Sequence, residues 1–164
     1  MKDKKAFLFY FLMSIIFLDF GNQIKKISYN PYIENHSNPI FSISHTTNQG
    51  GAFGVFQNHT NLLAIFGIIA IALITFYVYK NIKFSDKTAL LSITLFTAGA
   101  LGNLIERITN GYVIDYIKLN FIDFPIFNMF DILICLGIFI YAIFVLIEQK
   151  KVINEQKLQN NSDK

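Results

Sequence analysis

The chain has 164 residues, of which 53% are hydrophobic and only 15% are charged, a composition that excludes an ordinary soluble domain. Its net charge of +3 comes from lysines that flank apolar segments instead of forming one patch, which argues against a nucleic-acid partner. Cys135 is the only cysteine, so no internal disulfide and no thiolate metal cluster can form. The composition therefore predicts a membrane protein.

Four apolar segments are each close to the ~20 residues that cross ~30 Å of hydrocarbon. Within one integral membrane domain, residues 1–164, they predict spans at residues 6–26, 61–80, 88–107 and 127–147. Long apolar runs without strict alternation favour helices over a barrel, so the predicted fold class is an all-α membrane protein with four transmembrane helices. Most of the 14 basic residues lie near the chain ends and in the link after the second span, which predicts cytoplasmic termini.

Two regions outside the spans have their own character. Residues 41–47 alternate in polarity, and an apolar stretch resumes at Phe53 after the Gly-containing residues 48–51, which predicts a hairpin of two short strands. We therefore expect a small β-containing platform outside the membrane between the first and second helices. Residues 148–164 are polar and predict a frayed cytoplasmic tail.

Two carboxyl groups have informative surroundings, and acidic residues near a membrane are functional by default. Asp115 lies in an extended apolar stretch just after the third span, where desolvation should raise the pKa of a carboxyl group. Asp131 lies at the start of the fourth span, three residues after Asn128, which is a favoured N-cap type. The helix dipole favours negative charge there. Both carboxyl groups are expected at the same outer interface.

Two carboxyl groups at one interface would share a proton, so that one takes a proton from water and the other donates to a carbonyl oxygen. This is the chemistry of an aspartic protease, with Asp131 holding more of the negative charge and Asp115 more of the proton. A simpler interpretation is that each carboxyl group only caps a helix or pairs with Lys118 or Arg107.

Four blocks, spread from the first span to the fourth, resemble those of the lipoprotein signal peptidase (signal peptidase II) family. The first resembles a block that usually reads Asp-Gln-x-x-Lys, and the second resembles Asn-x-Gly-x-x-Phe. In chain order the blocks are Asn22-Gln23-Ile24-Lys25-Lys26, Asn48-Gln49-Gly50-Gly51-Ala52-Phe53, Gly102-Asn103-Leu104-Ile105-Glu106-Arg107 with Gly111-Tyr112-Val113-Ile114-Asp115, and Phe127-Asn128-Met129-Phe130-Asp131.

The resemblance implies that Asp115 and Asp131 are the catalytic pair of an aspartic endopeptidase with no metal and no cofactor. It implies a bacterial inner-membrane hydrolase whose site faces the extracytoplasmic side. The implied partners are membrane lipids and a prolipoprotein, which is cut before its diacylglyceryl-modified cysteine, and we expect a monomer. The residues implied to bind substrate or shape the site are Asn48, Gly50, Asn103, Arg107, Asn128, Asn22 and Lys26. For the asparagines, bridging of helices by hydrogen bonds is the simpler alternative.

Three positions depart from the family pattern. Asn22 stands where the family usually has Asp, and Asp19, on the same helix face, could supply the missing carboxylate near Lys26. Glu106 stands where the family usually has Asp, and we expect it to form an ion pair with Arg107, the next residue. Phe130 replaces a small residue before the last Asp. None of these changes removes a catalytic atom.

A small proton-coupled transporter or channel is the main alternative, because intramembrane carboxylates also mark proton relays. A relay needs ionisable groups across the bilayer, however, and residues 61–79 and 88–105 contain none. A Ser-Lys peptidase would need a serine beside one of the few outer lysines, and none is evident. A zinc protease is disfavoured because His36, His45 and His59 lack i, i+4 spacing.

Overall fold

The computed structural model describes residues 3–34, 36–51, 54–83 and 85–162. Within these residues, four helices are long and apolar enough to cross a membrane, and two strands form a small antiparallel sheet, which confirms the predicted fold class. The elements are α1 (Lys4–Ser28), β1 (Phe41–Asn48), α2 (Thr60–Asn81), α3 (Lys87–Asn110), β2 (Val113–Leu119) and α4 (Met129–Ser162).

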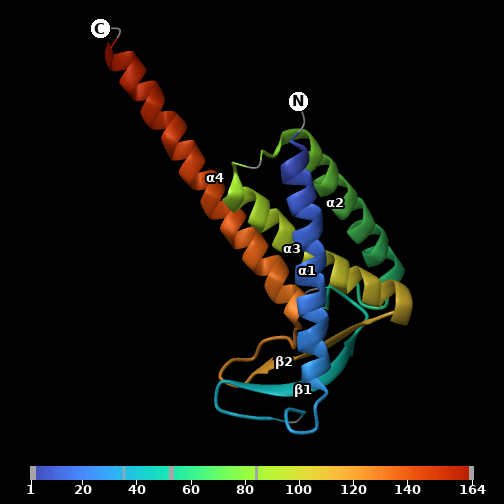
Figure 1. Cartoon of the computed structure of the whole chain (residues 1–164). Helices are drawn as coiled ribbons and strands as arrows, with labels where there is room; N and C mark the ends of the chain where they lie inside the picture. Colours follow the sequence, from blue (N-terminus) through green and yellow to red (C-terminus); the bar gives the residue numbers. More distant parts are fainter. Residues whose placement is uncertain (1–2, 35, 52–53, 84, 163–164) are drawn as a thin grey trace.

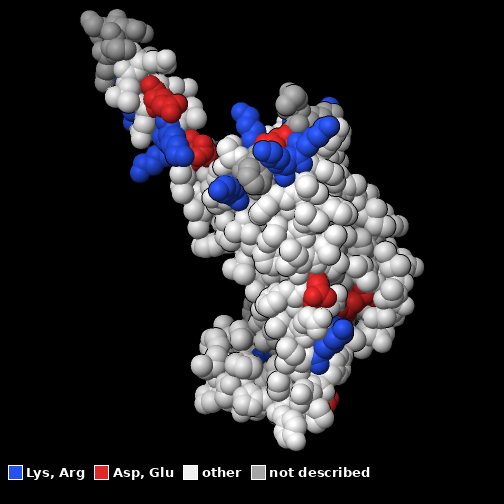
Figure 2. All heavy atoms as spheres, viewed as in Figure 1, with Lys and Arg blue, Asp and Glu red and all other residues white. Residues whose placement is uncertain are grey.

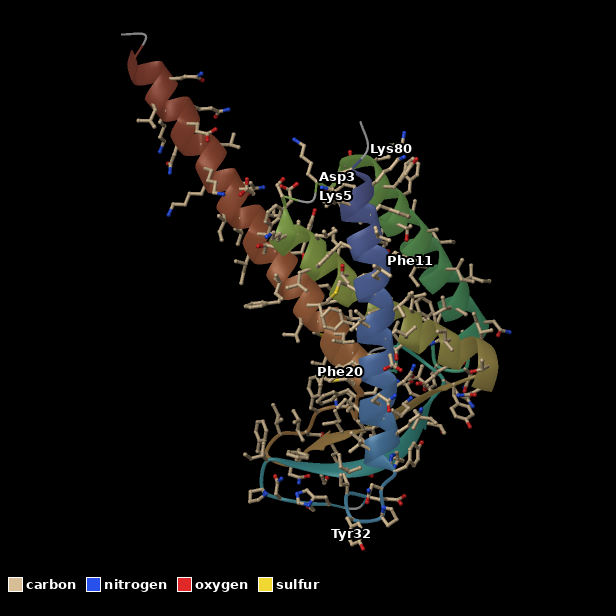
Figure 3. The ribbon with its side chains drawn as sticks, viewed as in Figure 1. Asp3, Lys5, Phe11, Phe20, Tyr32 and Lys80 are labelled. Atoms are coloured by element: carbon tan, nitrogen blue, oxygen red, sulfur yellow. The ribbon has the colours of Figure 1, made fainter. Side chains whose placement is uncertain are left out.

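Helix α3 lies at the centre of the bundle and packs against the three other helices (Figure 1). Most of its span is buried, whereas the spans of α1, α2 and α4 expose many large apolar side chains. Phe11 and Phe20 on α1 are two of these exposed side chains (Figure 3). A helix that is apolar on all sides is suited to a hydrocarbon surrounding. The outer helices therefore face lipid, while α3 forms the core.

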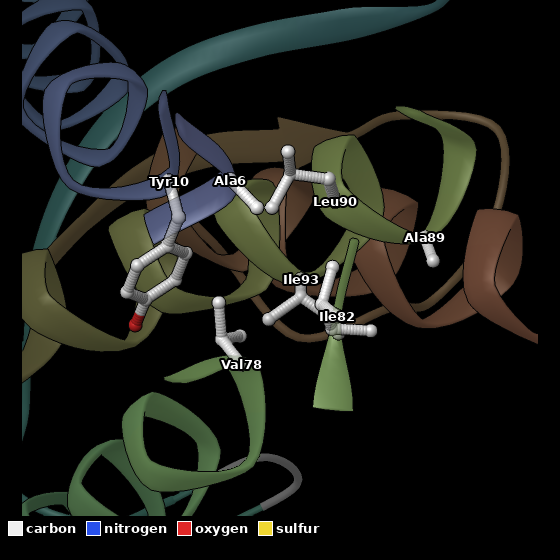
Figure 4. Packing of buried hydrophobic residues seen from close by; sticks show 7 residues of the cluster. All are labelled: Ala6, Tyr10, Val78, Ile82, Ala89, Leu90 and Ile93. Carbon is white, nitrogen blue, oxygen red and sulfur yellow. The ribbon is translucent and has the colours of Figure 1, made fainter. Parts of the chain in front are cut away.

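Side chains from α1, α3 and the end of α2 form a buried cluster (Figure 4). The hydroxyl group of Tyr10 lies 2.9 Å from Thr75 Oγ1 and donates to Thr97 Oγ1 at 3.2 Å, so polar contacts also join these helices. Interhelical hydrogen bonds of this kind add specificity where lipid is as apolar as the core. The cluster consists of Ala6, Tyr10, Val78, Ile82, Ala89, Leu90 and Ile93.

Glycines let the helices approach closely around the start of α4. The ring of Phe130 fills the space that a Cβ atom would need at Gly21 on α1 and at Gly102 on α3. On α3, a Cβ atom at Gly99 would meet the backbone of α4. Small residues at helix interfaces permit such short separations. Phe130, which departs from the family pattern, is thus accommodated by two glycines and is only 1% exposed.

The sheet joins segments that are far apart in the sequence. Strand β1 pairs with β2, with Phe41 opposite Leu119 and Asn48 opposite Val113. The predicted hairpin is therefore wrong, because β1 takes its partner from the segment after α3. Phe53, at which the second strand was expected to begin, lies outside the described residues, and residues 54–58 form turns.

The two ends of the bundle differ in charge. Figure 2 shows Lys and Arg gathered around the N-terminus, the link between α2 and α3, and the polar part of α4, with a band below that carries no charge on this face. Lys5 and Lys80 lie at this end, whereas Tyr32 lies at the sheet end (Figure 3). The predicted frayed tail is also wrong, because α4 stays helical to Ser162, aided by an ion pair between Lys151 and Glu148 at 2.6 Å. Such i, i+3 pairs stabilise exposed helices.

Candidate active site

Asp115 lies in the middle of β2, opposite Thr46 of β1, and is only 2% exposed. Helix α3 ends at Asn110, and the left-handed backbone of Gly111 (φ 79°) turns the chain into β2. Asp115 accepts hydrogen bonds from Asn48 Nδ2 at 2.9 Å and from Asn128 Nδ2 at 2.7 Å. Burial raises the pKa of the Asp115 carboxyl group, and the two amide donors oppose that rise.

Asp131 lies in the first turn of α4, where its carboxyl group and Asn128 cap the helix reciprocally. The Asn128 backbone N–H donates to Asp131 Oδ2 at 3.0 Å, while Asn128 Oδ1 accepts from the backbone N–H groups of Phe130 (2.7 Å) and Asp131 (3.2 Å). This confirms Asn128 as the predicted N-cap. Asn103 Nδ2 donates to the other oxygen of Asp131 at 2.8 Å, so α3 also holds this carboxyl group.

Asn128 connects the two carboxyl groups. Its side-chain amide donates to Asp115 and to Asn103 Oδ1 (3.2 Å), and its backbone donates to Asp131. Every carboxyl oxygen of the pair thus receives an N–H group from asparagine. Among the hydrogen bonds and ion pairs of the described residues, none joins either carboxyl group to Lys118 or Arg107. The ion pairs with Lys118 or Arg107 that the sequence left open are therefore not present in the described part of the chain, whereas Asp131 does cap α4.

Arg107 holds the loop after β1. Its Nη2 donates to the Gly50 carbonyl oxygen at 2.8 Å and its Nη1 to the Asn103 carbonyl oxygen at 3.2 Å, while Gly50 N–H donates to Asn48 Oδ1 at 2.9 Å. Arg107 Nε is buried and has no partner among the described residues. The expected ion pair with Glu106 is therefore wrong, because Arg107 binds main-chain carbonyl groups.

Glu106 instead joins α1 to β2. Its Oε1 pairs with Lys25 Nζ, and its Oε2 accepts from the Ile114 backbone N–H at 2.9 Å. Sequence reasoning missed Lys25, although a signal was present. The buried positions of α1 include Ser14 and Gly21, and Lys25 follows Gly21 by four residues, on the same helical face.

Two of the site residues implied by the resemblance lie away from this network. Asn22 and Lys26 are exposed on α1. Asp19, expected to compensate for Asn22, is also exposed, and it accepts a long hydrogen bond of 3.5 Å from Gln23. The other seven are brought together: Asn48, Gly50, Asn103, Arg107, Asp115, Asn128 and Asp131.

A cavity of about 940 Å³ opens beside the two carboxyl groups. Its polar side chains come from the network just described, and the remainder of its wall is mainly apolar. Residues 124–127 and helices α2, α3 and α4 contribute to it. The residues that line it include Asn48, Asn103, Arg107, Asp115 and Asp131 together with Leu63, Leu104, Phe124, Ile132, Cys135, Leu136 and Phe139.

A membrane-spanning helical bundle that presents two carboxyl groups to one apolar cavity has the features of an integral membrane enzyme. The family model described as signal peptidase (SPase) II matches residues 11–147. The chain belongs to the signal peptidase II family, which makes it a bacterial membrane peptidase and supports the removal of signal peptides from prolipoproteins.

Individual relatives agree with this assignment. The lipoprotein signal peptidase of Clostridium tetani is 40% identical over 112 residues, which cover 66% of this chain and 71% of that protein. That of Clostridium acetobutylicum is 32% identical over 133 residues, 79% of this chain and 83% of that protein. A solved structure described as a bacterial membrane enzyme superposes with a TM-score of 0.76 at 26% identity, covering 87% of this chain and 90% of that one.

Proposed function

We propose that the chain is an aspartic endopeptidase that cuts prolipoproteins before a diacylglyceryl-modified cysteine, with Asp115 and Asp131 activating the attacking water. One observation carries the proposal: Asn128 donates to both carboxyl groups at the wall of a single apolar cavity. Carboxyl groups held together in this way ionise one at a time, because two like charges at close range are unfavourable. The pair then contains one acid and one base.

We assign Asp115 as the acid and Asp131 as the base because Asp115 lies in a strand, whereas Asp131 lies at a helix N-terminus, which favours negative charge. Burial raises the pKa of Asp115, so it keeps a proton at a pH where a free Asp has lost it. Asp131 lies at the N-terminus of α4, where the helix dipole and the Asn128 N–H favour negative charge. In the first step a water oxygen bonds to the peptide carbonyl carbon, Asp131 takes one water proton, and Asp115 protonates the carbonyl oxygen. In the second step the C–N bond breaks, the leaving nitrogen receives the proton held by Asp131, and one hydroxyl group of the intermediate returns its proton to Asp115, which restores the starting state of the pair.

Substrate binding would use the polar and the apolar parts of the cavity. Arg107 Nε is a buried donor without a partner among the described residues, and Arg107 lines the cavity, so we assign it to a main-chain carbonyl oxygen of the signal peptide. An unpaired buried donor is costly until a ligand satisfies it. The apolar wall, which includes Leu136 and Phe139 of α4, suits the acyl chains of a lipid-modified cysteine.

The orientation follows from the charged end of the bundle. Loops rich in Lys and Arg face the cytoplasm, and these residues gather at the end opposite the sheet (Figures 1 and 2). The sheet and the two carboxyl groups would therefore face the extracytoplasmic side, where signal peptides of exported lipoproteins emerge. We expect the protein to act there as a monomer.

The test uses purified protein in detergent and a prolipoprotein with or without its diacylglyceryl group. Asp115→Asn and Asp131→Asn should each lower kcat by about 10³- to 10⁶-fold, because neither amide can replace the acid or the base. Asp123→Asn, which changes an exposed carboxyl group near the sheet, is the matched control and should keep its activity. Wild-type activity in either variant of the pair would contradict the proposal. Equal cleavage of the substrate without lipid would contradict the lipid specificity alone.

A further inference from the structure

We propose that Lys25 and Glu106 form a positioning pair that fixes the Asp115 strand against α1 and α3. The family motif places the functional lysine of this helix at Lys26, whereas the structure assigns the role to Lys25. This inference rests on the proposed function, since it concerns how the acid of the carboxyl pair is held. Neither Lys25 nor Glu106 lines the cavity, so the pair acts through Asp115 and not on the substrate.

The contacts of Glu106 place it next to the acid. One of its oxygens pairs with Lys25 Nζ and the other accepts from the backbone N–H of Ile114, the residue that precedes Asp115. The side chains of Lys25 and Glu106 are each only 12% exposed. Removing either partner of a largely buried ion pair is strongly destabilising, because the other charge is then buried without a partner. The pair therefore fixes the strand one residue from the carboxyl group.

Lys25 also lies next to the segment that carries the second carboxyl group. Its Nζ is 5.9 Å from the centroid of the Phe130 ring, within the range of a cation–π interaction. Phe130 precedes Asp131 and fills the space between Gly21 and Gly102. Lys25 thus contacts α4 directly and reaches β2 through Glu106. One lysine on α1 links the segments that carry the acid and the base.

The electrostatic surroundings of Asp115 agree with this geometry. Burial raises the pKa of Asp115, and the positive charge of Lys25 lowers it. The other charged groups around Asp115 are Arg107 from α3 and Asp131 from α4, and the uncharged donors are the amides of Asn48 and Asn128. Glu106 neutralises much of the Lys25 charge. The pair therefore influences when Asp115 loses its proton as well as where it lies.

Lys26 does not meet these conditions. It is exposed and lies about 100° around the helix from Lys25. The buried positions Ser14, Gly21 and Ser28 of α1 recur every seven residues, and Lys25 lies on their side of the helix. Lys25 occupies a variable position of the motif, directly before the motif lysine, so this chain has two candidate lysines, of which the inner one makes the contacts.

The test compares Lys25→Met, Lys25→Arg, Lys26→Met and Glu106→Gln in detergent, measuring kcat and KM across pH. Lys25→Met should lower kcat about 10- to 100-fold, as a displaced reacting group does, with KM changed less than about threefold because the cavity is intact. The loss should be at least ten times that of Lys26→Met. Lys25→Arg keeps the charge and should recover much of the activity.

The pH profile separates positioning from a merely structural role. Without the Lys25 cation, Asp115 keeps its proton to higher pH, so the alkaline limb of the Lys25→Met profile should move to higher pH. In Glu106→Gln the charge of Lys25 is no longer neutralised, so the alkaline limb of the pH profile should move to lower pH. Opposite shifts cannot arise from a general loss of folded protein, which elution and thermal midpoints monitor separately.

Three outcomes would overturn the inference. The first is activity in Lys25→Met within threefold of wild type, and the second is a larger loss in Lys26→Met. The third is an unshifted alkaline limb in both Lys25→Met and Glu106→Gln. If Lys25→Met is recovered in too low a yield, Glu106→Gln, which also breaks the pair, is compared with Lys26→Met instead, and equal activity of these two variants would contradict the inference. Asp115→Asn is measured in parallel. Wild-type activity in this variant would contradict the proposed catalytic pair, whereas the Lys25 and Glu106 variants test only the positioning pair.

Discussion

Asn128 and Asp115 are joined by a side-chain hydrogen bond of 2.7 Å, and the backbone of the same asparagine holds Asp131. Because Asn128 also caps α4, the helix terminus and the carboxyl pair depend on one residue. The position of one carboxyl group relative to the other is therefore fixed at the start of the helix.

Replacing Asn128 with Ala should impair both activity and stability. The variant loses the donor to Asp115 and the cap of α4, so we expect kcat to fall about 100-fold and the free energy of unfolding to fall by about 1–2 kcal/mol. Cleavage kinetics and the thermal midpoint in detergent measure the two effects. Asn120→Ala, which removes contacts of 2.6 and 3.1 Å with Asn38 and Ser42 in the sheet region, should affect stability alone. Activity in Asn128→Ala within threefold of wild type would show that catalysis does not depend on the hydrogen bond from the Asn128 side chain to Asp115.

The pH dependence of cleavage should report the proton on Asp115. Burial raises its folded-state pKa above the unfolded value, so its contribution to stability is present at low pH and is lost as pH rises through the folded pKa. Activity should fall over that same alkaline limb as the acid loses its proton. Asn48→Ala removes a donor that favours the ionised form, so the limb should move to higher pH. A downward shift in this variant would show that Asn48 does not act on the ionised carboxylate.

Gly102→Ala should destabilise the bundle, because the added methyl group would overlap the Phe130 ring. Overpacking of this kind costs about 1–3 kcal/mol. Gly67→Ala is the matched control, since its Cβ atom would lie 3.5 Å from Leu104 Cδ1 and alanine is the better helix former. In the double variant Gly102→Ala/Phe130→Ala, the loss of the thermal midpoint should be smaller than the sum of the two single losses. If the two single losses of the thermal midpoint were additive in the double variant, the Phe130 ring would not be what excludes a side chain at residue 102.

Tyr10→Phe should weaken the contact of α1 with α2 and α3. The variant loses the hydroxyl group that lies between Thr75 and Thr97. Interhelical hydrogen bonds in membranes are worth about 0.6 kcal/mol on average and up to about 1.7, so a small but measurable fall of the thermal midpoint is expected. Tyr32→Phe, at a side chain that is 94% exposed, should leave the midpoint unchanged. Equal midpoints for both variants would show that the Tyr10 hydroxyl adds no stability.

The features that the sequence predicted correctly are those with local causes. Long apolar runs specify membrane helices whatever their neighbours are. The N-cap at Asn128 and the acidic first turn at Asp131 depend only on residues within one turn of α4. The extended backbone at Asp115 likewise follows from the apolar stretch around it.

The features that the sequence missed depend on contacts between distant segments. Strand β1 could pair with either neighbour by its pattern, and only the packing of α3 brings β2 beside it. The choice of Lys25 over Lys26 depends on which face of α1 meets α3, and the partner of Glu106 depends on both helices. The expected frayed tail failed for a different reason, because helix propensity and the Glu148–Lys151 pair extend α4 beyond its apolar part.

The pairing of β1 with β2 has a consequence for biosynthesis. Asp115, Asp131 and the asparagine that joins them come from the last third of the chain, while Asn48 and Lys25 come from the first. A chain released before the fourth helix is made would have three helices and would lack Asp131. Under the proposed function, such a truncated chain would be inactive, so that proteolysis would begin only after the fourth helix has been inserted.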